Sequence, residues 1–307
     1  MYTHTDGRKF PTGAIPSPKV EGVPFVGKSS TPYDWSTTTL CYDPVVKDQG
    51  QSSSCGGNAT AYKEELNNKI PQSAKSIYSL CFVPGGGSSE PGLWNVISNT
   101  GIATEANVPS IPNTEASFED TTWNRNLSIK TNKNIVYVNL DIESIAEAVR
   151  DNNGVILGIS GYDNGTWLST DPVVPIVPIS QCWCHWVICR GAIMRNGVKT
   201  LVIKNSWGSQ AGAEGTQFLS ENYLPYIWSA WTYSEIPNSF KFTKLLKYGM
   251  TDPDVGKLQT ILGLSNPTNY FGRWTLINLL YFQLKNGLPL SGKVDLTTQN
   301  FLNLNSA

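Results

Sequence analysis

One stretch of the chain, residues 47–62, limits the fold most, because it places a cysteine where a helix begins. It reads K-D-Q-G-Q-S-S-S-C-G-G-N-A-T-A-Y. The serines before Cys55 supply hydroxyls for a helix N-cap, and Ala59, Tyr62 and Leu66 then recur at helical spacing. We therefore expect Cys55 in the first turn of a helix. The positive end of the helix dipole favours an anion there, so the thiolate should form more readily.

Two later residues extend this pattern from a helix to a catalytic site. His185 lies 130 residues after Cys55 in C-W-C-H-W-V-I-C, and Asn205 lies 150 residues after it in L-V-I-K-N-S-W-G. Each stands next to a short apolar run that is typical of a buried strand. A nucleophilic thiol needs an imidazole to take its proton, and the imidazole needs a third group to set its tautomer. A lone cysteine is more often a small buried residue, but the three together favour catalysis.

Residues 34 to about 228 resemble a papain-like cysteine peptidase along the whole segment. Asp34-Trp35 resembles the start of the mature domain of that family. Gln49 precedes Cys55 by six residues, as does the glutamine of the family's oxyanion hole. The resemblance implies an α+β fold with a helical lobe and an antiparallel β-barrel-like lobe over residues 34–237, and an active site between the lobes.

Two further motifs carry the resemblance. Gly85-Gly86-Gly87, followed by G-I-A-T-E-A-N-V-P, resembles the glycine wall and its continuation, which implies that Gly86 or Gly87 offers backbone hydrogen bonds to an extended substrate. N-S-W-G at residues 205–208 is the most specific piece. In that family the tryptophan, here Trp207, shields the hydrogen bond between Asn and His from water.

The mechanism that the resemblance implies needs no metal or organic cofactor. Cys55 would attack a peptide carbonyl, and the oxyanion would be held by the Cys55 backbone N–H and the Gln49 side chain. His185 would protonate the departing amine and then activate water, while Asn205 orients His185. The expected partner is a polypeptide substrate.

The sequence departs from the family pattern near the candidate nucleophile. The family's C-G-S-C-W reads S-S-S-C-G, so Ser52 replaces a disulfide cysteine and Gly56 replaces an aromatic residue. Trp186 follows the histidine where a small residue is usual, and Ala211 stands near the position of a second tryptophan. No catalytic atom is removed, but the disulfide pattern and the shape of the groove are affected.

The other cysteines suggest neither full disulfide pairing nor a metal site. Five cysteines remain besides Cys55, and an odd number cannot pair completely within one chain. Cys182, Cys184 and Cys189 lie near His185, but C-x-C-H lacks a second well-spaced pair of ligands. We therefore expect no metal.

Composition and charge exclude several classes of partner. Charged residues are 15% of the chain and aromatic residues 11%, with ten Trp, so most of the chain should be globular. A net charge of −1 without a dense basic stretch argues against nucleic acid. No run of 18 apolar residues predicts a transmembrane helix, and no secretory signal is visible. We expect a monomer that is extracellular, associated with the cell wall or encoded by a phage.

Residues 1–33, here called the arm, contain five Pro and four Gly with little periodicity. A flexible, extended tail is the simplest interpretation. Papain-like enzymes are commonly held inactive by an N-terminal segment across the groove, so the resemblance also allows a role as a short pro-segment.

The remaining elements follow from periodicity and turn residues. We expect helices at residues 55–68 and 77–82, a strand at 135–140, a helix capped by Ser144 that ends before Gly154, and a strand at 155–159. Residues 160–181 are rich in Gly, Pro and Ser and should form a long loop near the groove.

A second domain is expected at residues 238–307, after Ile236-Pro237-Asn238. Residues 241–307 hold seven basic and three acidic residues, which gives a local charge of +4 against −5 for the rest. Apolar residues form two helical faces and predict a three-helix bundle. These faces consist of Val255, Leu258, Ile261 and Leu262, and of Leu276, Leu279, Leu280 and Phe282.

The pattern of this domain resembles the peptidoglycan-binding domain of bacterial and phage cell-wall enzymes. Tyr270, Arg273 and Trp274 are candidate ligand contacts, and the alternative is a stabilising or protein-docking bundle. The whole chain is thus interpreted as a cysteine endopeptidase targeted to the bacterial cell wall. A hydrolase of peptidoglycan stem peptides and a non-catalytic wall-binding protein are the alternatives.

Overall fold

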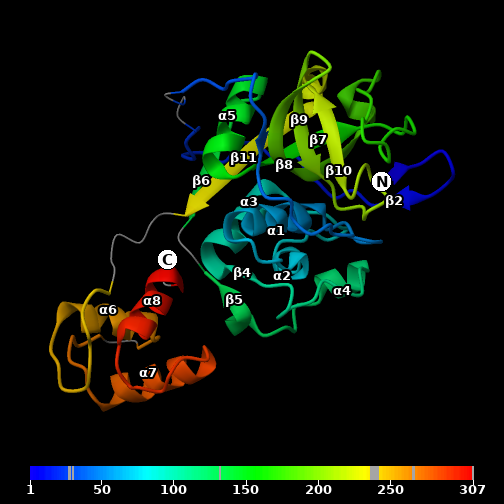
Figure 1. The fold of residues 1–307 in the computed structure, drawn as a ribbon. Coiled ribbons are helices and arrows are strands. Elements are labelled where there is room, and N and C mark those ends of the chain that lie inside the picture. Colours follow the sequence, from blue (N-terminus) through cyan, green and yellow to red (C-terminus); the bar gives the residue numbers. More distant parts are fainter. Residues whose placement is uncertain (27–28, 30, 131–132, 236–241, 265–266, 306–307) are drawn as a thin grey trace. The chain divides into compact units, whose positions relative to one another are not determined.

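The computed structural model describes residues 1–26, 29, 31–130, 133–235, 242–264 and 267–305 (Figure 1). The chain divides into two compact units, Met1–Ser234 and Glu235–Ala307. The expected boundary at Ile236-Pro237-Asn238 lies outside the described residues. Each unit has its own apolar core and is described by itself.

The helical lobe of the first unit is built around α1 (Cys55–Asn68), which begins and ends where the sequence predicts. Its other elements are α2 (Ala74–Tyr78), α3 (Glu90–Asn95), the π-helical turn η1 (Val96–Thr100), α4 (Glu115–Glu119), η2 (Arg125–Leu127), and the short paired strands β4 (Ile102–Ala103) and β5 (Ser128–Ile129). The second helix begins three residues earlier than predicted, because Ser73 caps it by accepting a hydrogen bond from the Ser76 N–H.

The sheet lobe is a sheet in which the described strands follow the order β10-β9-β8-β7-β11-β6, with β3 paired to β8. The strands are β3 (Thr39–Leu40), β6 (Lys133–Tyr137), β7 (Val155–Gly161), β8 (Trp183–Arg195), β9 (Val198–Lys204), β10 (Thr216–Ser220) and β11 (Ile227–Glu235). The pairs from β10 through β11 are antiparallel, which confirms the α+β class. The short helices η3 (Ile179–Gln181) and η4 (Glu221–Tyr226) connect strands.

Successive side chains of β7 and β8 pack into different apolar clusters, because side chains alternate between the two faces of a sheet. Leu157 and Val187 pack in a cluster with α5 (Ile142–Asn152). Ile156 and Ile188 pack in a second cluster with residues of α1. The central residues of both strands are therefore apolar on both faces, which explains the short apolar runs in the sequence.

Helix α5 corrects one predicted cap. Its N-cap is Asp141, whose carboxylate accepts a hydrogen bond from the Ser144 N–H at 2.8 Å. Ser144 thus supplies a backbone donor and is not itself the cap. The helix ends at Asn153, which has a left-handed backbone, and Gly154 follows as predicted.

The described residues of the arm pack against the rest of the first unit. Its strands β1 (Tyr2–Thr3) and β2 (Lys9–Phe10) form an antiparallel hairpin, and both Tyr2 and Phe10 are buried. Beyond the hairpin, Ala14 bridges to Ser88, and the Val20 N–H donates to the Tyr137 hydroxyl. The interpretation as a flexible tail is therefore wrong for the described residues of the arm.

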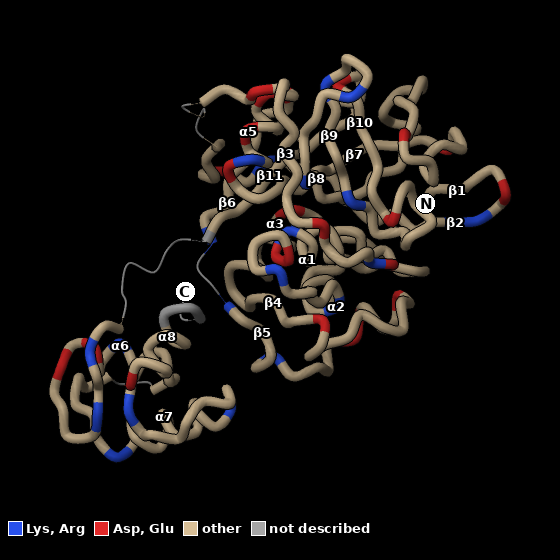
Figure 2. Tube along the Cα trace, in the orientation of Figure 1, with Lys and Arg blue, Asp and Glu red and all other residues tan. Residues whose placement is uncertain are grey.

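The second unit contains α6 (Pro253–Ile261), α7 (Arg273–Lys285) and α8 (Leu296–Asn305). Its buried core consists of Phe242, Leu246, Val255, Leu258, Phe271, Leu279, Val294 and Leu302. Of the predicted faces, Leu262, Leu276 and Phe282 are half-buried against this core, while Ile261 is exposed. Lys and Arg outnumber Asp and Glu along this unit in Figure 2, as its sequence requires.

No helix in the described part of the chain is long and apolar enough to cross a membrane. All six cysteines are free thiols. Ser52, which stands where the family has a disulfide cysteine, instead donates its hydroxyl proton to the Gln49 carbonyl at 2.7 Å.

Candidate active site

Cys55 is the first residue of α1 and is fully buried. Ser54 occupies the N-cap position, but its side chain does not cap the helix. Its hydroxyl and carbonyl oxygens instead accept hydrogen bonds from the Asn58 amide, both at 3.0 Å. Gly57 is required for packing, because a Cβ there would lie 2.8 Å from the Ala74 carbonyl oxygen. The helix N-terminus is therefore set by contacts that the serine run alone does not reveal.

His185 and Asn205 are brought together by neighbouring strands. His185 lies on β8, and Asn205 directly follows β9. His185 Nε2 and Asn205 Oδ1 are 2.9 Å apart. Asn205 Nδ2 donates to Gln217 Oε1 at 2.9 Å, and the Gln217 amide donates to the carbonyls of Trp167 and Ser169.

This chain of amides sets the tautomer of the imidazole. Because Gln217 must donate through its nitrogen, its oxygen faces Asn205, and Asn205 must therefore present its own oxygen to His185. His185 Nε2 consequently carries the proton. His185 Nδ1 is buried and has no hydrogen-bond partner in the described part of the chain. Its lone pair is free to accept a proton. Gln217 was missed in the sequence, although it is a single amide within the apolar strand T-Q-F-L-S.

The surroundings of Cys55 oppose ionisation, contrary to the expectation from the helix dipole. Burial raises the pKa of the thiol to about 12, although the backbone N–H groups of Trp186, Gly56 and Gly13 favour the thiolate. Burial likewise lowers the pKa of His185 to about 4, although its hydrogen bond to Asn205 favours the imidazolium. Both groups are thus neutral with the arm in place, because desolvation outweighs the dipole.

Gln49 is held in place through its backbone and through both polar atoms of its side-chain amide. Its backbone N–H donates to the Ser206 carbonyl at 2.8 Å, and its side-chain oxygen accepts from the Ser206 hydroxyl at 2.7 Å. The amide nitrogen donates to the carbonyls of Ser52 at 2.8 Å and Pro11 at 3.0 Å. Ser206 is a second residue that the sequence analysis missed. It is visible within N-S-W-G, but its contact with Gln49 spans 157 residues.

Trp207 packs over the imidazole of His185, with ring centroids 4.7 Å apart. Its Nε1–H donates to the Pro11 carbonyl at 3.1 Å. The arm also packs on this ring, since Tyr2 stacks on Trp207 at 5.3 Å and Phe10 lies at the same distance. His185 and Asn205 are both fully buried beneath these contacts.

The arm then crosses the face that carries Cys55. The Ser88 N–H donates to the Gly13 carbonyl at 2.8 Å, and the Ile15 N–H donates to the Ser88 carbonyl at 3.0 Å. The Ala14 N–H donates to the Cys184 carbonyl at 3.4 Å, one residue before His185. An extended peptide therefore lies between the two lobes.

The glycine wall lies directly before the residue that pairs with the arm, Ser88. The Gly86 N–H donates to the Val83 carbonyl, and the Gly87 N–H donates to the Tyr78 hydroxyl, so both serve the loop itself. Ser88 pairs with the arm instead. Gly87 still matters, because it has a positive φ and a Cβ there would collide with the arm at Gly13.

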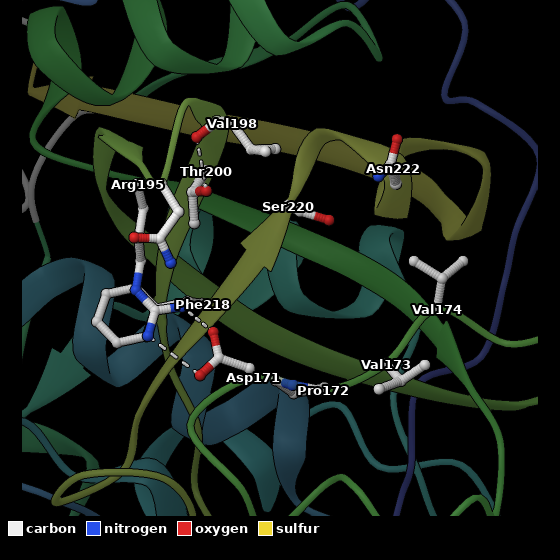
Figure 3. Close-up of a pocket in the computed structure, with 11 residues that line it drawn as sticks. Asp171, Pro172, Val173, Val174, Arg195, Val198, Thr200, Phe218, Ser220 and Asn222 are labelled. Carbon is white, nitrogen blue, oxygen red and sulfur yellow. Dashed lines mark hydrogen bonds and ion pairs between the residues drawn. The ribbon is translucent and has the colours of Figure 1, made fainter.

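The loop of residues 160–181 contributes in two places. Trp167 packs edge-on against Trp207 with centroids 6.1 Å apart. Farther along, Asp171 forms an ion pair with Arg195 at a pocket of about 380 Å³ (Figure 3). That pocket lies at the turn between β8 and β9 and is lined by none of the candidate catalytic residues.

The candidate ligand residues of the second unit lie at the start of α7. Tyr270 is 46% exposed and Trp274 is 72% exposed, and Arg273 is also on the surface. Gly272 precedes the helix, and the Tyr270 backbone bridges to Thr251. These three side chains are thus accessible to a large ligand. Groups of three or more His, Cys, Asp or Glu side chains suited to a metal ion do not occur among the described residues.

Comparison with known proteins identifies the family of the first unit. The family model described as papain family cysteine protease matches residues 30–224, which is more than half of the chain. No curated protein sequence matches the chain significantly.

Solved structures share the fold at low sequence identity. The first is xylellain, a cysteine protease from Xylella fastidiosa, with a TM-score of 0.59, 18% identity, and coverage of 73% of this chain and 96% of that one. Digestive procathepsin L 3 of the Tenebrio molitor larval midgut follows with a TM-score of 0.54, 21% identity, and coverage of 69% and 73%. The proform of the ragweed pollen allergen Amb a 11, a cysteine protease, has a TM-score of 0.50, 21% identity, and coverage of 64% and 65%. The chain therefore belongs to the papain family of cysteine proteases, which are hydrolases that act on polypeptides.

Proposed function

We propose that the chain is a cysteine endopeptidase in which Cys55, His185 and Asn205 form the catalytic triad and Gln49 completes an oxyanion hole. The observation that carries this proposal is the orientation of His185. Its Nε2 faces Asn205 at 2.9 Å, while its buried Nδ1 has no partner among the described residues. An imidazole held in one tautomer with a free lone pair is suited to accept a thiol proton.

The reaction then follows from the positions of the donors. Transfer of the Cys55 proton to His185 gives the thiolate, which attacks the peptide carbonyl carbon. His185 returns this proton to the departing amine, and the acyl group remains on sulfur. A water molecule, activated by His185, then releases the acid and restores the thiol. General acid–base help of this kind contributes about 10² to 10⁴ in rate.

Gln49 is suited to bind the oxyanion because its amide nitrogen already donates to a carbonyl oxygen, that of Pro11 in the arm, at 3.0 Å. Ser206 holds the amide in this orientation through Gln49 Oε1. The first N–H groups of a helix lack helical partners, so the Cys55 N–H is the second donor. Removal of one such donor typically costs about 3 kcal/mol of transition-state stabilisation.

The arm is proposed to act as an inhibitory pro-segment. Its backbone carbonyls accept hydrogen bonds from the Gln49 amide, the Trp207 indole and the Ser88 N–H, and the first of these is the proposed oxyanion donor. With the arm in place, the thiol and the imidazole are both buried and neutral. Hydrolysis thus requires the arm to leave.

The second unit is proposed to direct the enzyme to bacterial cell wall through Tyr270, Arg273 and Trp274. Exposed aromatic rings beside a cation are suited to a glycan that carries carboxylates. Replacement of Trp274 by Ala should reduce sedimentation with purified sacculi about tenfold, whereas Tyr248→Ala, which removes another exposed ring of this unit, should not. Equal sedimentation of both variants and the unmodified chain would remove these residues from the proposal.

The catalytic assignment is tested by replacing Cys55 with Ala and assaying casein and purified sacculi side by side. Hydrolysis should fall by at least about 10³-fold, and labelling by an epoxide thiol reagent should disappear. Cys182→Ala is the matched control, because it removes another free thiol and should change neither measurement. Full hydrolysis by the Cys55→Ala chain would end the assignment. Cysteine-dependent release from sacculi without casein cleavage would favour a stem-peptide hydrolase.

A further inference from the structure

We propose that the subsite facing Ser88 accepts only a small side chain, and that Trp186 sets this limit. The inference rests on the proposed function and narrows its substrate class. Substrates would carry Ala, Gly or Ser at the residue that pairs with Ser88.

The arm marks where this subsite lies. Gly13 and Ile15 make hydrogen bonds of 2.8 and 3.0 Å with the Ser88 N–H and carbonyl, so the residue between them, Ala14, faces Ser88. Ala14 also donates to the Cys184 carbonyl at 3.4 Å. Backbone groups of Ser88 and Cys184 would pair in the same way with any extended peptide.

The space around Ala14 is filled. Its side chain is 8% exposed and belongs to the packed cluster that contains Cys55 and Trp186. Cys184 and Trp228 pack against the same cluster. Interiors packed to normal density have no room for several added carbon atoms.

Trp186 is fixed against the residue that pairs with the arm. Its Nε1–H donates to the Ser88 carbonyl at 3.1 Å, the same oxygen that accepts from Ile15. The indole reaches this position because Gly56 has no side chain. A Cβ on Gly56 would collide with the Ser88 hydroxyl and lie 3.1 Å from Trp186 Cδ1. Gly56 and Trp186, which both depart from the family pattern, therefore fit together: the small residue leaves the space that the indole fills.

Trp186 has no space into which it can withdraw. Trp228 packs edge-on against it, with ring centroids 4.7 Å apart. Gly158 is the residue opposite Trp186 in the pairing of β7 with β8, and a Cβ on Gly158 would lie 2.6 Å from Trp228 Cη2. The missing side chain of Gly158 thus leaves room for the Trp228 ring beside Trp186.

The first test changes the residue that occupies the subsite in the full chain. In Ala14→Leu, the larger side chain should not fit, so the arm should be displaced and the initial rate on a peptide with Ala at the pairing position should rise at least about tenfold. Ala14→Gly is the matched control and should keep the rate of the unmodified chain. An unchanged or lower rate in Ala14→Leu would overturn the proposal, because the subsite would then accept leucine.

The second test uses the full-length Ala14→Leu chain and peptides that differ only at the pairing residue. We expect kcat/KM for Ala to exceed that for Leu and Phe by about 10- to 200-fold. Equal or reversed values would overturn the size limit. Adding Trp186→Ala to Ala14→Leu should open space for the leucine and lower the rate again, provided that thermal unfolding shows a folded double variant. The peptide series decides the question if that variant does not fold.

The same series separates this inference from the proposed function. Ala14→Leu with Cys55→Ala should be inactive on every peptide. If it hydrolyses them, the proposed function fails. If hydrolysis requires Cys55 but shows no preference for a small residue, only the size limit fails.

Discussion

His185 is oriented through two amide side chains in series rather than through a carboxylate. Asn205 presents its oxygen to the imidazole because Gln217 accepts from its nitrogen at 2.9 Å. Gln217 itself is anchored on two carbonyls of the loop after β7, those of Trp167 and Ser169. The tautomer of the imidazole therefore depends on a residue that touches neither the substrate nor the imidazole.

Replacement of Gln217 by Leu should remove this control. Asn205 could then rotate its amide, and kcat should fall by about 10- to 100-fold with a smaller change in KM. The measurement is the pH profile of kcat/KM, in which the limb assigned to His185 should shift. Gln217→Asn keeps an amide that can accept from Asn205 and donate to a carbonyl, and should retain more activity. Equal losses of stability and activity in both variants, without a shifted limb, would indicate a purely structural role.

The burial of His185 predicts that acid releases the arm. Its pKa is lowered from 6.5 to about 4 with the arm bound, so the open state takes up the proton first as the pH falls. The free energy that favours the arm-bound state over the open state should therefore fall by up to about 1.4 kcal/mol for each pH unit between these values. In Cys55→Ala, which cannot cleave itself, residues 1–26 should become more sensitive to an added acid-tolerant protease from pH 7 to pH 4.5.

The control for this pH dependence is the addition of His185→Gln, which removes the titrating imidazole. The pH dependence of arm cleavage should then become flat in the same range. A slope that persists in this variant would assign the effect to another group, such as Glu90, whose pKa is raised by burial.

Strand β8 carries several parts of the site on consecutive residues. The Cys184 carbonyl accepts from the arm, His185 supplies the imidazole, and Trp186 supplies both an N–H near the sulfur and an indole on Ser88. Because side chains alternate along a strand, His185 and Trp186 point to different sides of the sheet. One strand thus holds the backbone that pairs with the arm next to the candidate catalytic imidazole.

The cap of α5 gives a prediction at the scale of an element. Asp141→Ala should lower the free energy of unfolding by about 1 kcal/mol, because the Ser144 N–H loses its acceptor at the start of the helix. Ser144→Ala leaves this hydrogen bond intact and should have little effect. Chemical denaturation of both variants measures the difference. A larger loss in Ser144→Ala would contradict the observed cap.

Separate cores characterise the whole molecule. The first unit is held by two large clusters on the two faces of its sheet, and the second unit by a smaller cluster around Leu258 and Phe271. Domains with cores of their own can unfold independently. The charges follow the same division, since the second unit is the more basic one (Figure 2).

Leu258→Ala should therefore destabilise the second unit alone. Removal of this buried side chain should cost about 2 to 5 kcal/mol and lower one of two calorimetric transitions, while casein hydrolysis stays unchanged. Leu284→Ala is the matched control, because Leu284 is 64% exposed and its loss should move neither transition. A single transition lowered by Leu258→Ala would show that the two cores unfold together.

The family and the candidate triad could be predicted because they depend on local patterns. Each signal lies within about ten residues: Cys55 at the start of a helix, His185 beside an apolar run, and N-S-W-G. The separations of these three signals along the chain match one family. The bounds of α1 and the first residue of the strand after Gly154 could be predicted for the same reason. Hydrophobic periodicity and turn residues predict the local secondary structure in which they lie.

Contacts across long separations could not be predicted from one sequence. Ser206 reaches Gln49 over 157 residues, Trp186 reaches Ser88 over 98, and Ser88 rather than Gly86 or Gly87 pairs with the arm. The ionisation of Cys55 was predicted in the wrong direction for the same reason. The helix dipole is encoded locally, whereas desolvation depends on what the fold places over the sulfur. Thus the sequence alone determined which chemical groups are available, and the tertiary structure decided their partners and their protonation, because burial is a property of the assembled chain.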